Sequence, residues 1–183
     1  RNLFSGVEFA DSFVVDPHKW LFAPYDCCAL LYRQPEHGAN AHSQFASYLD
    51  QVDRNEWNPA DYAIHLTRRA RGLPFWFSLA TYGTQKYEEA IEATLAVTQG
   101  VATEIKARDY LHLVMEPDLS VLLFERTGWV MDDYVAWSND KATKGVVLCV
   151  LTTWQGRPVL RMCFVNPLTQ IDQVVEVLET LAC

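Results

Sequence analysis

Long apolar runs are absent from this sequence, although half of its 183 residues are hydrophobic. A transmembrane helix needs roughly 18 or more consecutive apolar residues, and no segment approaches that length. The first residues also lack the charged start, apolar centre and small-residue cleavage site of a secretory signal peptide. We therefore expect a globular chain without a membrane partner.

Positive charge is scarce as well, with 15 Lys and Arg residues against 23 Asp and Glu residues. Nucleic-acid binding depends on clustered Lys and Arg side chains that neutralise phosphates, so we expect no nucleic-acid partner. One short basic cluster contains Arg68, Arg69 and Arg71. On a helix Arg68 and Arg71 would share a face, and we expect one of them to form a structural ion pair. We interpret all three arginines as packing residues.

The five cysteines follow neither a CxxC spacing nor the spacing of a zinc-binding motif, and we expect no metal site. Neighbouring residues on a strand point to opposite faces, which makes a disulfide between Cys27 and Cys28 implausible. Free cysteine in apolar surroundings behaves as a small hydrophobic residue. This use of cysteine fits a reducing, cytoplasmic location.

What the sequence does contain is a single lysine, Lys19, within the mostly apolar run Val14–Phe22. An ammonium group in such surroundings either reaches the solvent along its alkyl chain or loses its proton. A neutral amine attacks carbonyl carbons, so a desolvated lysine is a candidate for forming a Schiff base. Lysines in apolar runs commonly reach the surface, and local chemistry leaves both interpretations open.

Two β-rich runs, Ser12–Asp16 and Cys27–Arg33, lie on either side of Lys19. This arrangement places Lys19 on a turn or strand end, where a side chain can project into a cleft. The two runs predict neighbouring pieces of one sheet.

The following segment, residues 34–62, contains scattered Gly, Pro and Asn without an apolar period. It predicts a mobile loop of about thirty residues, with short irregular helix at most. A helical pattern then covers Ala63–Arg71, before Gly72 and Pro74 break or kink it.

Residues 83–183 predict a small α+β domain that a long helix links to residues 1–82. Gly83 ends the preceding segment, Lys86 begins the long helix, and Thr169 can cap a last helix. Further predicted elements are strands over Asp109–Glu116 and Ser120–Glu125, and a helix over Asp132–Lys144 that Gly145 stops. Strands over Val146–Thr153 and Pro158–Val165 are predicted to form a hairpin about Gln155-Gly156-Arg157.

Three motifs occur in order along the chain and carry a specific resemblance. They are Asp16-Pro17-His18-Lys19-Trp20, then Thr67-Arg68-Arg69-Ala70-Arg71-Gly72-Leu73-Pro74-Phe75-Trp76-Phe77 with Tyr82-Gly83, and finally Leu160-Arg161-Met162-Cys163-Phe164-Val165-Asn166-Pro167. The chain resembles the group II pyridoxal-phosphate-dependent amino-acid decarboxylases, which include the aromatic-L-amino-acid, histidine and glutamate decarboxylases. The resemblance implies a homodimeric α/β enzyme of fold type I. Residues 1–82 then end a large, mostly parallel-sheet domain, and residues 83–183 form a small C-terminal domain.

The resemblance also implies roles for individual residues. Lys19 matches the lysine that holds pyridoxal 5′-phosphate as an internal aldimine and yields it to the substrate amine before decarboxylation. His18 matches a residue near the cofactor phosphate, although a structural, hydrogen-bonded histidine is an alternative. Tyr48 matches a loop tyrosine that protonates the substrate carbon once carbon dioxide has left, with loop packing as the alternative.

Arg161 matches an arginine that lies at the active site and can meet the substrate carboxylate. A charged residue in an apolar strand needs either solvent or a partner. Strand alternation places Arg161 on the same face as Cys163 and Val165, which argues against simple exposure to solvent.

The family's residues that stack on the cofactor ring, pair with its pyridine nitrogen and grip most of its phosphate lie upstream of the lysine, and this sequence contains none of them. Because the chain also begins at Arg1 without methionine, it reads as the C-terminal portion of a longer protein. We expect it to hold the cofactor weakly or not at all, and to form a homodimer or bind the missing N-terminal portion.

Two alternatives to amino-acid decarboxylation stay open. The first is another fold-type I activity, such as that of an aldolase, a lyase or an aminotransferase. The second is a catalytically silent interaction module that pairs through exposed apolar surface.

Overall fold

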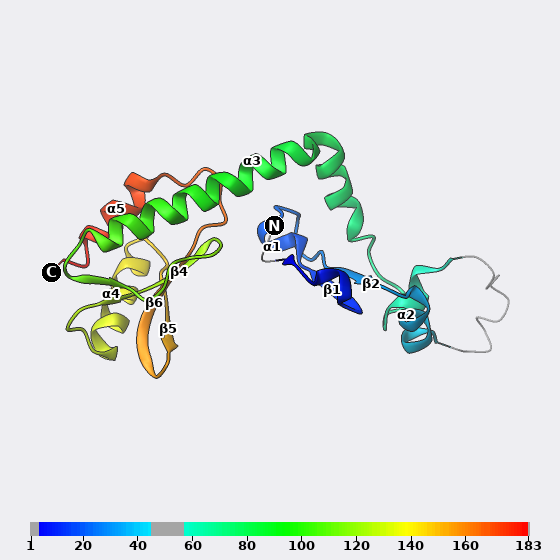
Figure 1. Cartoon of the computed structure of the whole chain (residues 1–183), viewed down its shortest axis with the longest axis horizontal. Helices are drawn as coiled ribbons and strands as arrows, with labels where there is room; N and C mark the ends of the chain where they lie inside the picture. The colour runs from blue at the N-terminus through cyan, green and yellow to red at the C-terminus, as the bar shows by residue number, and fades with distance from the viewer. Residues whose placement is uncertain (1–3, 45–56, 183) are drawn as a thin grey trace. The chain divides into compact units, whose positions relative to one another are not determined.

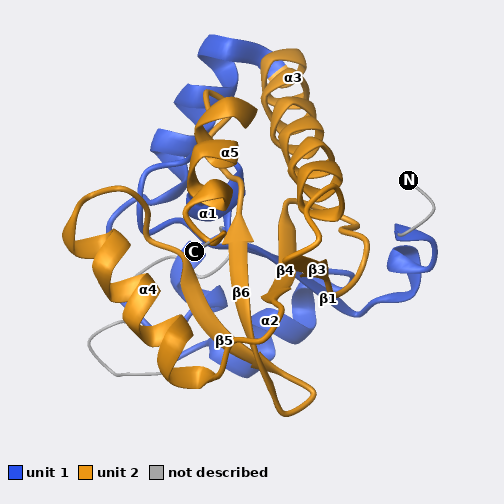
Figure 2. Cartoon of the chain, turned by 90° about the vertical axis from the view of Figure 1, so that its left-hand side faces the viewer, with its two compact units in different colours: residues 1–83 blue, residues 84–183 orange. Residues whose placement is uncertain are grey.

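The computed structural model describes residues 4–44 and 57–182. The chain forms two compact units, Arg1–Gly83 and Thr84–Cys183, which Figure 2 distinguishes by colour. Each unit has its own sheet, two-stranded in the first and four-stranded in the second, and Figure 1 labels the elements. No helix in the described part of the chain combines the length and apolarity that crossing a membrane requires. The assignment of residues 1–82 to a larger cofactor-binding domain stays a prediction.

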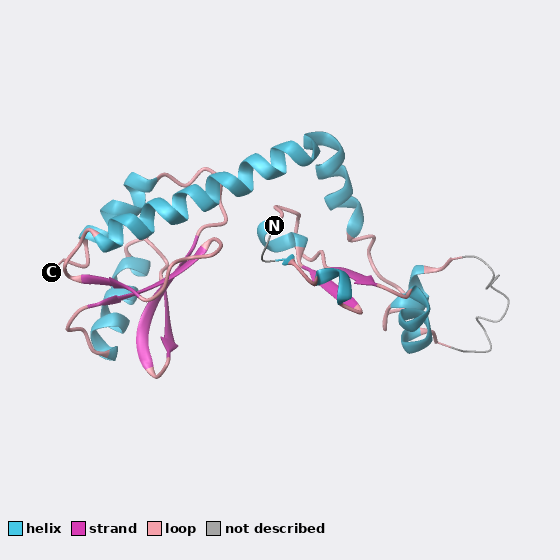
Figure 3. Ribbon diagram, viewed as in Figure 1, coloured by secondary structure: helices cyan, strands magenta, loops and turns pink. Residues whose placement is uncertain are grey.

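The first unit contains two antiparallel strands, β1 (Ser12–Val15) and β2 (Ala29–Tyr32), at the predicted positions. The one-turn helix α1 (Pro17–Trp20) follows β1 directly, and Figure 3 distinguishes helices from strands by colour. Lys19 therefore lies just beyond a strand end, as expected. Pro17 accounts for the change from strand to helix, because its fixed φ suits the first helical position and it lacks a strand N–H donor. The unit also contains two 3-10 turns, η2 (Val7–Phe9) and η4 (Pro59–Tyr62).

Both faces of the β1–β2 pair are apolar and open. Val14 lies opposite Leu30, and Phe13 lies opposite Leu31 on the other face. The exposed fractions are 58% for Val14, 45% for Leu30, 40% for Phe13 and 54% for Leu31. Strands that are apolar on both faces normally lie between two packed layers. Within the described residues the first unit supplies no such layers, and its strand pair is antiparallel, so the implied parallel strands are not among them.

Part of the segment predicted as a mobile loop is helical. Helix α2 (Pro35–His42) starts with a proline, and its Gly38 packs closely against the ring of Tyr32. A Cβ atom on Gly38 would lie only 2.7 Å from Tyr32 Cε2. The density of Pro and Gly misled the prediction here, because Pro35 begins the helix and Gly38 allows its contact. Residues 45–56 lie outside the described residues, so mobility of the loop stays a prediction.

The helix predicted over Ala63–Arg71 is wrong. These residues form turns and irregular chain, and none of their side chains is buried. A helix this short is stable only when an apolar face packs against the protein, and this segment has no such face. Helix α3 (Gly72–Lys106) follows and is interrupted at Gly83, whose φ of 73° and ψ of 162° confirm the predicted break.

The second unit is an antiparallel sheet with helices, which confirms the predicted α+β organisation. The strand order is β3-β4-β6-β5. The strands are β3 (Leu111–Leu113), β4 (Val121–Arg126), β5 (Val150–Trp154) and β6 (Arg157–Cys163). The helices after α3 are α4 (Met131–Thr143) and α5 (Ile171–Glu179), and the residue that precedes α5 as its N-cap is Gln170 rather than Thr169. Strands β5 and β6 form the predicted hairpin, with positive φ at Gln155 and Gly156, as in type I′ turns.

The core of the second unit lies between the sheet and the helices. Helices α3 and α5 lie side by side (Figures 1 and 2), and a Cβ atom on Gly100 of α3 would lie 2.5 Å from Ile171 Cδ1 of α5. Phe124 of β4, Leu160 of β6 and Leu178 of α5 belong to the same cluster and are completely buried. This unit therefore encloses a continuous apolar core, which the first unit lacks among its described residues.

Truncation of a core residue tests this packing. The Leu160→Ala variant should lose about 2–5 kcal/mol of unfolding free energy, because the truncation leaves a cavity between sheet and helices. The matched control is Leu168→Ala, at a residue that is 77% exposed, where the change should stay within about 0.5 kcal/mol. Urea unfolding followed by far-UV circular dichroism measures both changes, and equal midpoints for the two variants would contradict the packing.

Candidate functional site

The junction between β1 and α1 places Lys19. A proline disfavours the helical conformation in the residue before it, and Asp16 accordingly has φ −102° and ψ 86° ahead of Pro17. The strand ends at this point, and buried Pro17 begins the turn of helix. Lys19 follows Asp16 by three residues, a spacing that brings the two side chains to one side of the turn.

The side chain of Lys19 is exposed and ion-paired. Its Nζ lies 2.5 Å from Asp16 Oδ2, and 68% of the side chain is accessible. The hydrogen bond to Asp16 raises the pKa of Lys19, and the same bond lowers the pKa of Asp16. The interpretation of Lys19 as a desolvated lysine is therefore wrong for this chain, because its alkyl chain carries the ammonium to solvent and to a carboxylate.

The side chain of His18 contacts the loop that precedes β2. Its Nδ1 donates a hydrogen bond to the backbone carbonyl of Cys27 at 2.5 Å, and its ring meets the Tyr25 ring edge-on at 5.0 Å. The neutral ring then carries its hydrogen on Nδ1, which leaves Nε2 as the nitrogen that could meet a ligand. The structural role weighed for His18 is present, and a role toward phosphate stays a prediction.

A tight turn after α1 returns the chain toward β2. Phe22 has a φ of 55°, in the left-handed region that bulky residues rarely adopt. Such a residue costs on the order of 1 kcal/mol and persists where its surroundings hold it. The amide of Ala23 donates to the carbonyl of Pro17 at 3.0 Å, and Ala23 is buried. No feature of the sequence predicts the conformation of Phe22.

Asp26 gathers the basic cluster beside this turn. Its carboxylate lies 3.0 Å from Arg71 Nε and 3.1 Å from Arg69 Nη2, and the hydrogen bond to Arg71 lowers the pKa of Asp26. The expected structural ion pair exists, because Arg71, one of the two arginines considered for it, pairs with Asp26. The segment is not helical, however, and Arg69 reaches the same carboxylate. Arg68 instead donates to the backbone carbonyl of Pro59 at 2.8 Å. Sequence analysis did not select Asp26, although an acidic residue in a turn before a strand is a candidate partner for a basic cluster.

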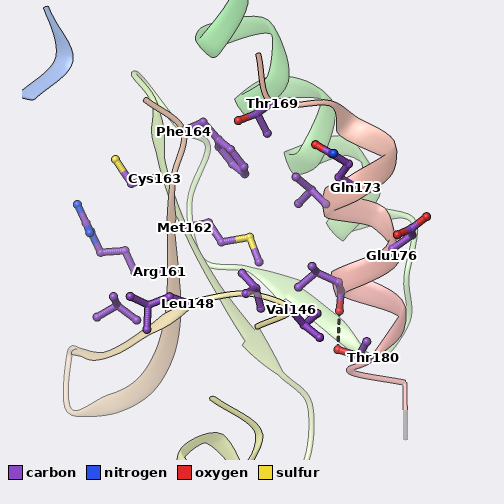
Figure 4. Close-up of a pocket in the computed structure, with 14 residues that line it drawn as sticks. Val146, Leu148, Arg161, Met162, Cys163, Phe164, Thr169, Gln173, Glu176 and Thr180 are labelled. Atoms are coloured by element: carbon purple, nitrogen blue, oxygen red, sulfur yellow. Dashed lines mark hydrogen bonds between the residues drawn. The ribbon is translucent and has the colours of Figure 1, made fainter. Parts of the chain in front are cut away.

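Arg161 lies on the open face of the sheet in the second unit. Leu160 and Met162 are buried, whereas Arg161 and Cys163 are exposed. Figure 4 shows Met162 on one side of β6, with Arg161 and Cys163 on the other. The expectation that a shared face with Cys163 and Val165 argues against exposure is therefore wrong. Arg161 and Cys163 lie on a face that no described helix covers, with Leu123 and Val150 of the neighbouring strands beside Arg161. Val165 follows the end of β6 and is exposed as well.

The structure brings together only some of the predicted site residues. His18 and Lys19 are consecutive in the first unit, while Arg161 belongs to the second unit. Tyr48 lies outside the described residues. The residues that sequence analysis did not select as site residues, but that contact this region, are Asp16, Cys28 and Asp26.

The side chains around Lys19 suit one part of a pyridoxal 5′-phosphate site. An accessible primary amine can form a covalent bond with an aldehyde carbon. The protonated ring nitrogen of the cofactor would need a carboxylate beside it. The two nearby carboxylates do not serve, because Asp16 is paired with Lys19 and Asp26 with arginines. The described residues of the first unit can therefore supply the amine that would bind the cofactor covalently, but not the side chains that would contact its ring.

Replacement of Asp26 tests the link between the turn and the basic cluster. In Asp26→Asn, trypsin should cleave after Arg69 and Arg71 about two- to fivefold faster, because exposed ion pairs contribute modestly. The pKa of Asp26 is lowered, so its contribution is present above the unfolded-state pKa and disappears as pH falls through the folded-state pKa.

Timed digestion at pH 8 with mass spectrometry measures the two cleavages. Asp140→Asn is the control, since Asp140 pairs with Lys141 and Lys144 in the second unit. Unchanged cleavage in Asp26→Asn, or the same acceleration in both variants, would refute the link.

Comparison with known proteins gives a consistent result. The family model of the pyridoxal-dependent decarboxylase conserved domain matches residues 1–127. The chain is 27% identical to the aromatic-L-amino-acid decarboxylase of Bacillus atrophaeus across 96% of its own length and 39% of that protein. It is 38% identical to the acidic amino acid decarboxylase GADL1 of Xenopus tropicalis across 68% of its own length and 25% of that protein.

Solved structures agree with this match. Mouse CSAD in apo form superposes with a TM-score of 0.84 at 26% identity, over 99% of this chain and 41% of that one. Oryza sativa TDC with PLP and tryptamine superposes with a TM-score of 0.87 at 24% identity, over 98% of this chain and 39% of that one. At this identity the superposition is evidence of a shared fold only. The chain thus spans 25–41% of the length of these relatives. Since the family model covers more than half of its residues, the chain belongs to the pyridoxal-dependent decarboxylase family, and its fold is that of the corresponding part of the α/β, fold-type I enzymes.

Proposed function

We propose that this chain is part of an enzyme that decarboxylates an L-amino acid with pyridoxal 5′-phosphate. The observation that supports this most directly is the position of Lys19, an accessible primary amine at the junction of β1 and α1 within the family match. The chain spans 39% of a relative named as an aromatic-L-amino-acid decarboxylase. The activity therefore belongs to the longer protein, and the substrate is proposed as an L-amino acid without further specification.

Lys19 acts in this proposal as the nucleophile that anchors the cofactor. Its ammonium must first give up a proton, after which the Nζ lone pair can bond to an aldehyde carbon. When bound, the cofactor supplies a ring that takes up the electrons of the bond broken as carbon dioxide leaves. Lys19 holds the cofactor in place and releases it to the incoming amine.

Three further residues have proposed roles. His18 contacts the cofactor phosphate through Nε2, since Nδ1 is engaged by the Cys27 carbonyl. Tyr48 donates a proton to the substrate carbon, which a loop residue can do after closure has excluded water. Arg161 binds the substrate carboxylate, for which an exposed guanidinium on an apolar face is chemically suited.

Removal of the Lys19 amine tests the proposed function. In the gene product that contains this chain, Lys19→Ala should lower carbon dioxide release from an L-amino acid by several orders of magnitude, because no second amine lies at the junction. The matched control is Lys86→Ala, since Lys86 has 67% side-chain exposure and an ion pair of 2.5 Å to Glu89. Near-normal turnover and retained cofactor absorbance in Lys19→Ala would overturn the assignment.

The same assay separates the two alternatives. Another fold-type I activity would give a keto acid or an aldol cleavage product without stoichiometric carbon dioxide. A silent interaction module would show neither product nor a protein-bound cofactor absorbance band. The family match over residues 1–127 favours decarboxylation over both alternatives.

We also propose that the chain assembles, as a homodimer or with the N-terminal portion of its protein, in the cytoplasm. The open apolar faces of the β1–β2 pair support assembly, because exposed strands and apolar patches seek partners. The cysteines that the structure describes are free thiols, which suits a reducing compartment.

Sedimentation tests the assembly. The chain should sediment as a dimer or larger species at micromolar concentration, and the Val14→Lys variant should lower the associated fraction, because a charge on this face opposes burial. Val130→Lys is the control, at a residue of the second unit that is 62% exposed. A stable monomer at all concentrations would contradict assembly through these strands.

A further inference from the structure

We propose that Asp16 is a positioning residue for Lys19: it holds the lysine ammonium in a resting ion pair, and this pair must open before Nζ can bond to an aldehyde. The proposal rests on the proposed function, because it concerns the same lysine. It adds a restraint on the reaction that the assigned roles do not contain.

The geometry of the pair carries the argument. Asp16 Oδ2 and Lys19 Nζ lie 2.5 Å apart across one turn of chain. Asp16 occupies the N-cap position of α1, yet its carboxylate makes no capping hydrogen bond to the helix backbone. An N-cap aspartate normally accepts from the backbone amides two or three residues later. Here the carboxylate is directed to the lysine instead.

Two titratable side chains besides Lys19, those of Cys28 and His18, act on the Asp16 carboxylate. The Cys28 thiol, from the start of the return chain, also donates a hydrogen bond to the Asp16 carboxylate, and His18 lies beside Asp16 on the same turn. The interactions that raise the pKa of Lys19 come first from Asp16 and to a lesser degree from Cys28. Desolvation opposes the contribution of Asp16 and is smaller than it, since Lys19 is exposed.

The chemical step balances without an oxidant or reductant. Protonated Lys19 gives one proton to solvent, and the freed lone pair on Nζ forms a bond to the aldehyde carbon. The carbonyl oxygen takes up protons and leaves as water, while a carbon–nitrogen double bond forms and is protonated. The net change is ammonium plus aldehyde to protonated imine plus water, and only the first proton loss requires the Asp16 contact to weaken.

The chain contains a matched pair for comparison. Lys86 and Glu89 also lie three residues apart with Nζ and Oε2 at 2.5 Å, and Lys86 is 67% exposed against 68% for Lys19. Lys86 lies in the second unit, on helix α3, and has no proposed part in catalysis. Lys86 therefore serves as a control for Lys19, because each ammonium is held by a carboxylate three residues away.

The experiment measures imine formation at each lysine of the whole chain. The protein is mixed with pyridoxal 5′-phosphate between pH 7 and pH 10, quenched with borohydride at short times, and mapped by peptide mass spectrometry. In Asp16→Asn the rate at Lys19 should rise about two- to fivefold at pH 8, and its pH profile should move to lower pH, with Lys86 unchanged. Asp16→Glu, which keeps the carboxylate, should stay near the original rate.

The outcomes are distinct. In Glu89→Gln the rate at Lys86 should rise while that at Lys19 does not, which confirms that the method detects a lost ion pair. An unchanged or lower rate at Lys19 in Asp16→Asn, or an equal rise at Lys19 and Lys86, overturns the proposal. NMR titration of the Lys19 side chain should show a lower pKa in Asp16→Asn, independently of cofactor. These results do not depend on carbon dioxide release, so they can fail while the Lys19→Ala test succeeds, and the reverse.

Discussion

The burial of apolar side chains constrains the whole structure, and the two units meet this constraint differently. In the second unit, sheet and helices enclose Phe124, Leu160 and Leu178 completely. In the first unit, Val14 and Leu30 remain about half exposed on one face of a strand pair whose other face is also apolar. Each square ångström of apolar surface removed from water contributes about 25 cal/mol, so the open strand pair favours any surface that covers it.

Lys19, the residue that we propose as the cofactor anchor, lies at the end of this strand pair. Asp16 and Pro17 end β1 for steric reasons, and the helical turn that follows brings Lys19 back beside Asp16. The return chain adds the Cys27 carbonyl, which fixes His18, and Asp26, which holds Arg69 and Arg71. The anchor is therefore organised locally, although the strand pair beneath it is open. This explains how a chain that spans 39% of a relative can retain a structured lysine motif.

Sequence analysis predicted the parts of the fold that depend on period and turn chemistry. The strand runs on either side of Lys19, the break at Gly83 and the hairpin at Gln155 and Gly156 were all predicted, because alternation, positive φ and glycine fix them locally. The helix over Ala63–Arg71 was wrong, because its polar residues suit a helix only if some face is buried, and none is. Whether a helix face is buried depends on residues that are far away in the sequence.

The site shows the same division. The sequence motifs selected Lys19, His18 and Arg161 as candidate site residues, but they did not predict which side chains surround them. Sequence neighbours suggested a desolvated Lys19, whereas the turn of α1 exposes it to solvent and pairs it with Asp16. Alternation correctly placed Arg161 and Cys163 on one face of β6, but not whether that face is exposed, because which face the helices cover depends on packing far along the chain. Electrostatic partners such as Asp26 come from loops, where no period marks them.

Hydrogen exchange of the chain tests this account most directly, because it reports the stability of each unit separately. We expect the amides of β4 and β6 to show protection factors on the order of 10³ or more, as a closed core provides. The amides of β1 and β2 should exchange at least tenfold faster at low protein concentration, because their faces are open. Equal protection of both strand sets in the monomeric chain would contradict the claim that the first unit depends on further apolar surface.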